Sequence, residues 1–296
     1  MYTAVPPTAG AATAPSAAPS LTGWGVRRTA RLEFPGPAAL AGNAAHSARL
    51  RLYVTDMLRP YGLEFDEEAF ERGGQSYSEM AEALIAHTVP EGEVVDLLVL
   101  AHAVPDISPG RATTTYLSHV CPGGPMAFAI NDQGAAAAFT AMRLIREYAR
   151  TDGLRRSLLL VLEQATLPHA TGAAVMPAGN TGVAVLFGDG AAVSGLDQVT
   201  VRPGTPLSSL PAAISAVSPG HGADTTVVVG ASLAQQASDL SGSDVRTAVA
   251  DRPHTGAWWE LAGALADAKT SRLVLADYDD ESRSLCLATF SLDGPG

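Results

Sequence analysis

Three short runs of almost wholly apolar residues restrict the folds open to this chain. The runs are VVDLLVLAHAV (94–104), RSLLLVLEQA (156–165) and TTVVVGASL (225–233). Their β-branched and apolar residues follow one another with little polar alternation, which is typical of strands buried on both faces of a covered sheet. None approaches the roughly 18 residues that a membrane-spanning helix needs. The runs therefore predict a layered α/β protein with helices on both faces of its sheet.

Helical and strand-like patterns alternate along the chain in two successive halves. Helices are expected over 38–60, 67–72, 76–89, 113–120, 133–150, 207–217 and 258–268. Strands are expected at the start of 21–34, over 94–104, 126–130, 156–165 and 225–233, as two strands joined by a Gly-Asp-Gly turn within 182–196, and as a closing hairpin at 272–292. The second half repeats the order of the first more briefly, which indicates pseudo-duplication. We predict a flexible tail over 1–20, a first half over 21–198 and a shortened second half over 199–296. The tail is Pro-rich and uncharged, and it lacks the basic and apolar regions of a signal peptide.

Charge and cysteine content limit the partners and the compartment. The chain has 30 acidic and 19 basic residues, a net charge of −11, and Lys269 as its only lysine. Nucleic acids and anionic membranes bind clustered Lys and Arg, so neither is expected as a partner. Cys121 and Cys286 lie far apart in a sequence without a secretory signal, so we expect free thiols and a cytoplasmic location.

The segment from Ser76 to Leu196 contains a series of motifs in a definite order. They are SYSEMAEALIAHTV, VVDLLVLAHAV closing on Pro105-Asp106, PGRATTTYLSHV, Ala127-Phe128-Ala129-Ile130, LLLVLEQA, and Phe187-Gly188-Asp189-Gly190 followed by small residues. Together these motifs resemble the first half of β-ketoacyl synthase III enzymes. The resemblance implies a thiolase-like layered αβαβα fold made of two pseudo-duplicated halves. It also implies that the helix near Gln133 is the one at whose N-terminus the family carries its nucleophile, where backbone N–H groups stabilise a thiolate and an oxyanion.

The resemblance locates three catalytic positions, and the residue that the family uses is missing from each. The nucleophilic Cys falls at Gly134, or at Gln133 if the preceding turn is one residue shorter, and neither residue attacks an acyl thioester. The His falls at Gly230, and the Asn falls at Thr255 or His254. The alignment with Gln133 is similar to the chain-length-factor subunits of aromatic polyketide synthases, in which Gln replaces Cys. We therefore assign no catalytic residue and regard these five positions as vestigial.

Two bulky residues, Trp258 and Trp259, follow where the family keeps small residues near its acyl pocket. Two interpretations are open. The indoles either plug the acyl tunnel or cap a partner's pocket, or else one packs into the core and the other lies at an interface.

The remaining thiols and imidazoles are expected to be structural. Cys121 lies in a Pro-Gly loop without a local base, and Cys286 lies in an apolar strand, so neither replaces the nucleophile. His169, His221 and His254 lie in separate loops without metal-ligand spacing, so no metal and no cofactor is expected. Of the three, only His254 is placed by the resemblance at the mouth of the vestigial catalytic site, where the alternative is that it has a polar role.

Two acidic features are also expected to be structural. Asp189 should bond backbone amides in its Gly-Asp-Gly turn, and the DYDDES stretch (277–282) should form a solvated hairpin turn.

The functional hypothesis follows from the resemblance. Family enzymes dimerise by placing their sheets edge to edge, so a subunit that keeps the interface without the triad can stabilise a partner and shape its acyl pocket. The leading hypothesis is a non-catalytic subunit that pairs with an active ketosynthase III-like subunit in polyketide or fatty-acid-derived secondary metabolism. It would meet acyl carrier protein or acyl-CoA through that partner. Two alternatives stay open: an acyltransferase or condensing enzyme that uses a non-standard residue such as Cys121 or His254, and a stand-alone homodimer that binds acyl thioesters.

Overall fold

The computed structural model describes residues 21–108, 112–169, 175–190, 194–217, 224–238, 240, 243–267 and 269–292. The predicted tail, 1–20, lies outside the described residues. The strands are β1 (Trp24–Glu33), β2 (Leu97–Ala101), β3 (Met126–Ile130), β4 (Ser157–Glu163), β5 (Thr181–Asp189), β6 (Ser194–Arg202), β7 (Thr225–Val229), β8 (Asp244–Thr247), β9 (Arg272–Asp279) and β10 (Ser284–Leu292). The helices are α1 (Ala44–Leu58), α2 (Glu67–Arg72), α3 (Tyr77–Thr88), α4 (Thr113–Val120), α5 (Ala136–Thr151), α6 (Leu210–Val217), α7 (Ala234–Ala237) and α8 (Gly256–Ala266).

The strands form one mixed sheet whose two halves have the same pattern of strand pairing. Their order is β3-β2-β4-β5-β1-β6-β10-β9-β7-β8. In the first half β2 is parallel to β3 and β4, while β5 is antiparallel to β4 and β1; in the second half β7 is parallel to β8 and β9, while β10 is antiparallel to β9 and β6. The same pairing pattern thus occurs twice, which confirms the predicted pair of pseudo-duplicated halves.

The halves join where β1 and β6 pair briefly. Gly25 lies opposite Gly195 and Val26 opposite Ser194. A Cβ on Gly25 would collide with the carbonyl oxygen of Ser194, so the close approach of the two backbones requires a glycine there. The predicted division after residue 198 falls inside β6, which pairs with the second half.

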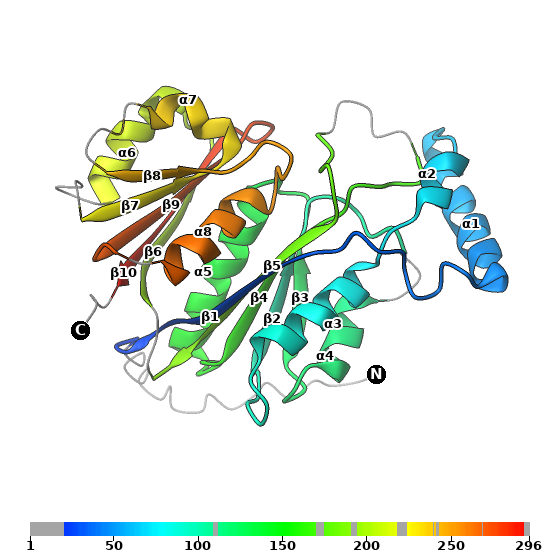
Figure 1. The fold of residues 1–296 in the computed structure, drawn as a ribbon, viewed down its shortest axis with the longest axis horizontal. Coiled ribbons are helices and arrows are strands. Elements are labelled where there is room, and N and C mark those ends of the chain that lie inside the picture. The colour runs from blue at the N-terminus through cyan, green and yellow to red at the C-terminus, as the bar shows by residue number, and fades with distance from the viewer. Residues whose placement is uncertain are drawn as a thin grey trace, which may run out of the picture.

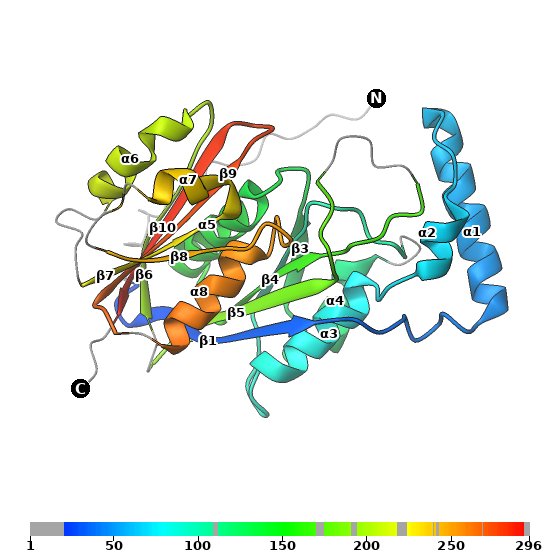
Figure 2. The ribbon, with the colours of Figure 1, turned by 45° about the horizontal axis from the view of Figure 1, so that its top comes forward.

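Helices fill three layers around the two half-sheets (Figures 1 and 2). α5 and α8 lie in the middle and pack against strands of both halves in one apolar cluster. α3 and α4 cover the outer face of the first half, and α6 and α7 cover the outer face of the second. The result is the αβαβα layering that the sequence predicted.

The central strands are buried on both faces, as their composition predicts. In β4, Leu158, Leu160 and Leu162 belong to the outer cluster under α3, while Leu159 and Val161 face α5. Every residue of β4 is buried, including Ser157 and Glu163 at its ends. Continuous apolar sequence is thus explained by burial between two helical layers.

Three predicted features differ in detail. The helix expected from residue 38 begins at Ala44, because Asn43 Oδ1 accepts the N–H of His46 at 3.0 Å and caps the helix there. β8 was not predicted, because this edge strand has no apolar pattern. Asp189 pairs with the guanidinium of Arg155, and no backbone amide among the described residues bonds its carboxylate. No helix in the described part of the chain is long and apolar enough to cross a membrane.

Candidate functional site

The N-terminus of the central helix α5 is closed by a carboxylate from β9. Ala135, the residue before the helix, donates its N–H to Asp279 Oδ2 at 3.2 Å. Gly134 precedes it in a left-handed conformation (φ +50°), and a Cβ at this position would collide with the same oxygen. Asp279 therefore occupies both the anion-binding end of the helix and the space of any side chain at residue 134.

A second aspartate fills the space beside Gly230, directly after β7. A Cβ at Gly230 would collide with Asp277 Oδ1, which accepts the N–H of Tyr278 at 2.8 Å. Asp277 is only 4% exposed, and burial raises the pKa of its carboxyl to about 7. This finding corrects the expectation of a solvated DYDDES turn. β9 continues through Asp279, and the exposed turn begins only after it.

Thr255, at the start of α8, is bound by a buried glutamate at the end of β4. Glu163 accepts hydrogen bonds from the hydroxyls of Thr255 (2.5 Å) and Thr181 (2.7 Å) and from the N–H groups of His254 (3.0 Å) and Thr255 (3.1 Å). Burial raises the pKa of Glu163, and the four hydrogen bonds oppose that shift. The carboxylate therefore holds the loop before α8 and engages the hydroxyl of Thr255.

Two imidazoles, His102 and His254, line a cavity of about 10 Å³ beside Gly134 and Ala135. Such a volume holds at most about one water molecule. Burial lowers the pKa of both histidines, so both are neutral at pH 7. His102 Nδ1 bonds the carbonyl of Val104 at 3.0 Å, whereas His254 Nδ1 is buried without a partner among the described residues. Sequence reasoning missed His102, although its place directly after the buried strand β2 was a signal.

The other predicted site residues lie apart from this cavity. Gln133 lies on the surface, and its Oε1 accepts a hydrogen bond from the hydroxyl of Thr140 at 2.7 Å. Trp258 is 1% exposed and meets Phe139 of α5 edge-on at 5.2 Å, whereas Trp259 is half-buried between Arg252 (4.0 Å) and Arg31 (5.0 Å).

The structure places no reactive thiol at the cavity. Cys121 caps the C-terminus of α4, and burial raises its pKa to about 11. Cys286 is fully buried in β10, and burial raises its pKa further. No group of three His, Cys, Asp or Glu side chains in the described ranges is arranged to hold a metal ion. His169 pairs with Phe65 in an isolated bridge, and His221 lies outside the described residues.

Taken together, the site contains two neutral imidazoles, three buried or half-buried carboxylates and the N-terminus of α5. These groups can hold and exchange a proton or a water molecule. None of the described residues that line the cavity is a Cys, Ser or Thr. The hydroxyl of Thr255, next to His254 in the chain, is engaged by Glu163.

Comparison with known proteins identifies the fold. No known family's sequence profile and no curated protein matches the chain. Solved structures do match it. The acyltransferase ChlB3 superposes with a TM-score of 0.62 at 16% identity, over 92% of this chain and 98% of its own. The tetronic acid condensing enzyme AbyA1 superposes with a TM-score of 0.62 at 16% identity, over 90% of this chain and 99% of its own. Xanthomonas campestris OleA with bound lauric acid and lauroyl-CoA superposes with a TM-score of 0.61 at 12% identity, over 91% of this chain and 99% of its own.

These similarities extend over nearly the full length of each neighbour. The chain therefore has the thiolase-like fold that the sequence motifs predicted, although the sequence identities establish the fold alone.

Proposed function

We propose that this chain is a non-catalytic ketosynthase III-like subunit. It pairs with an active β-ketoacyl synthase in polyketide or fatty-acid-derived secondary metabolism, stabilises that enzyme and shapes its acyl pocket. One observation carries the proposal: carboxylates fill the space beside both Gly134 and Gly230, where the resemblance puts the nucleophile and its histidine.

Asp279 opposes acyl chemistry by charge as well as by volume. A thiolate or oxyanion at a helix N-terminus is stabilised by unpaired N–H groups. Here the N–H of Ala135 is already engaged by Asp279, and a second anion would be repelled. With about 10 Å³ left beside Gly134, the site offers no room for an acyl chain.

The two edges of the sheet differ in charge, and only the uncharged edge is suited to pairing with a partner. β3 presents the apolar sequence MAFAI, with Met126 43% exposed and no charged side chain. The opposite edge, β8, carries Asp244 and Arg246, and Arg246 also pairs with Asp267 at 3.5 Å. Charges protect an edge strand against pairing, whereas an apolar edge invites it. We therefore assign the partner to the β3 edge.

A second surface favours association. Large exposed apolar side chains concentrate between residues 40 and 63, on and beside α1: Leu40, Leu52, Tyr53, Met57, Tyr61 and Leu63. This segment lies beyond the sheet at one end of the molecule (Figures 1 and 2). Such a concentration is typical of an interaction surface.

The test is co-expression with the triad-bearing ketosynthase encoded nearest to this chain. We expect co-purification, higher solubility than for the chain alone, and condensing activity that requires the partner's cysteine. Ala129→Lys on β3 should reduce co-purification at least tenfold. Thr247→Lys on β8 is the matched control and should leave it unchanged.

Two outcomes would contradict the proposal. One is a stable homodimer that never associates with a triad-bearing ketosynthase. The other is an equal effect of the lysine on either edge.

A condensing or acyl-transferring enzyme is the second candidate, because His102 and His254 meet at one cavity. This function predicts turnover of acyl thioesters by the purified chain alone, with loss of turnover in His254→Ala. Cys121→Ser is the control, because a buried thiol with a raised pKa is a poor nucleophile.

A further inference from the structure

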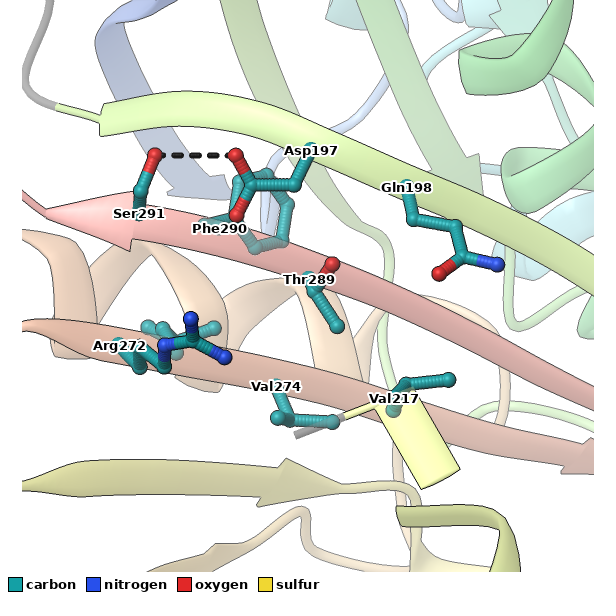
Figure 3. Close-up of a pocket in the computed structure, with 9 residues that line it drawn as sticks. Asp197, Gln198, Val217, Arg272, Val274, Thr289, Phe290 and Ser291 are labelled. Atoms are coloured by element: carbon teal, nitrogen blue, oxygen red, sulfur yellow. Dashed lines mark hydrogen bonds between the residues drawn. The ribbon is translucent and has the colours of Figure 1, made fainter. Parts of the chain in front are cut away.

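A second cavity lies on the outer face of the second half-sheet, away from the candidate site. Its volume is about 360 Å³, within the range of small-molecule pockets. Asp197 and Gln198 of β6, Thr289 and Ser291 of β10, and Arg272 of β9 line it, with Val217 and Val274 at one side (Figure 3).

Within the described residues, α6 covers less of its half-sheet than its counterpart α3 covers in the first half. α3 has 12 residues and covers the paired residues Leu158 and Leu186, which are buried in its cluster. α6 is described over 8 residues, Leu210–Val217, and residues 218–223 lie outside the described part of the chain. In the second half the paired residues Val274 and Thr289 lie beside Val217, and no helix among the described residues covers the sheet beyond them.

A β-bulge adds a carboxylate to the open face. On β6, Leu196 pairs with Phe290 and Gln198 pairs with Thr289, so Asp197 between them has no partner on β10. Its side chain turns over the sheet, and Asp197 Oδ1 accepts the hydroxyl of Ser291 at 3.0 Å (Figure 3). Bulges of this kind re-aim a side chain and are frequent beside binding sites.

A cation and an anion face each other across this floor. Arg272 lies on β9 and Asp197 on β6, with β10 between them, so their backbones are about 10 Å apart. The Arg272 side chain has no ion pair or hydrogen bond within the described part of the chain. The carboxylate of Asp224 accepts two hydrogen bonds from Ser271, which lower its pKa, and the charge of Arg272 lowers that pKa further. Oδ2 of Asp197 is likewise without a hydrogen bond among the described residues.

We infer that this cavity binds a small zwitterion, an amino acid whose carboxylate and ammonium are a few ångströms apart. The guanidinium of Arg272 matches a carboxylate with two parallel N–H donors. Asp197 Oδ2 accepts the ammonium at the other end. Thr289 and Gln198 offer hydrogen bonds between these two charges, and the methyl groups of Val217 and Val274 contact the carbon skeleton.

The test is calorimetric titration of the full chain with glycine, β-alanine and γ-aminobutyrate, which separate the two charges by increasing distances. Propionate and propylamine each carry one of the charges. We expect at least one zwitterion to bind ten times more tightly than either. Arg272→Gln and Asp197→Asn should each weaken that binding tenfold or more, and Val217→Trp should abolish it by filling the cavity.

Matched controls lie at the other end of the same hairpin, where Arg283→Gln and Asp280→Asn remove the same charges from its turn and should leave binding unchanged. All four altered charges are exposed, so the variants should keep the fold. The inference is overturned if no zwitterion binds, if propionate or propylamine binds equally well, or if the cavity variants bind like the wild type.

Discussion

At the residue scale, the candidate site is defined by which side chain fills which space. Two glycines, Gly134 and Gly230, have their missing side-chain volume taken by Asp279 and Asp277. The identity of the glycines could be read from the sequence. The aspartates were misread as a solvated turn, because acidic residues are usually exposed and only tertiary contacts bury them.

The contact between Gly230 and Asp277 gives a direct prediction. Gly230 has an ordinary extended backbone (φ −62°, ψ 159°), so Gly230→Ala adds no backbone strain. We expect it to lower the free energy of unfolding by about 1–3 kcal/mol through the clash alone. In an Asp277→Gly background the same change should cost little. Urea unfolding of the four proteins in this double-mutant cycle measures the coupling, and additive effects would show that the carboxylate does not occupy this space.

The pKa of Asp277 predicts a pH dependence of stability. Its folded pKa of about 7 lies above the roughly 3.9 of an unfolded aspartate, so the folded state binds more protons between these values. Stability should therefore fall as pH rises from about 4 to 7, by at most about 4 kcal/mol. Asp277→Asn should remove this loss, as measured by urea unfolding at several pH values.

Other buried groups require a control for this experiment. His102 and His254 have lowered pKa values, so their contribution to stability is lost as pH falls below about 6.5, which is the opposite direction. The difference between wild type and Asp277→Asn isolates the aspartate. Asp251→Asn, at an exposed position whose charge does not act on Asp277, should follow the wild-type curve. An unchanged slope in Asp277→Asn would refute the assignment.

At the element scale, the helices differ sharply in how much of them the protein covers. α5 buries eight residues between the half-sheets, whereas α1 buries only Val54 and Leu58. Periodicity predicted both helices, but it could not tell how much of each apolar stripe would be covered, because coverage depends on distant elements. An apolar stripe that is half covered is consistent with docking to another protein.

The poor coverage of α1 predicts its dynamics. Helices of about 15 residues are marginal without tertiary packing, so α1 should open locally at much lower free energy than α5. In hydrogen–deuterium exchange of the chain alone, we expect amides of residues 48–58 to exchange at least tenfold faster than those of residues 140–150. Similar protection of the two helices would contradict this prediction. Slower exchange at α1 after co-purification with the ketosynthase would place that helix in the interface.

At the scale of the whole molecule, the sequence by itself determined the order of elements other than β8, the doubly buried strands and the absence of Cys and His at 134 and 230. Each of these is a property of local periodicity or of residue identity. Tertiary structure alone decided that Asp277 and Asp279 close the site, that His102 and His254 meet there, and that a polar cavity lies over β6, β9 and β10. The reason is that these features join residues from different strands and from both halves of the chain. Their distances are set by the register of the sheet and the length of the covering helices, which no local pattern encodes.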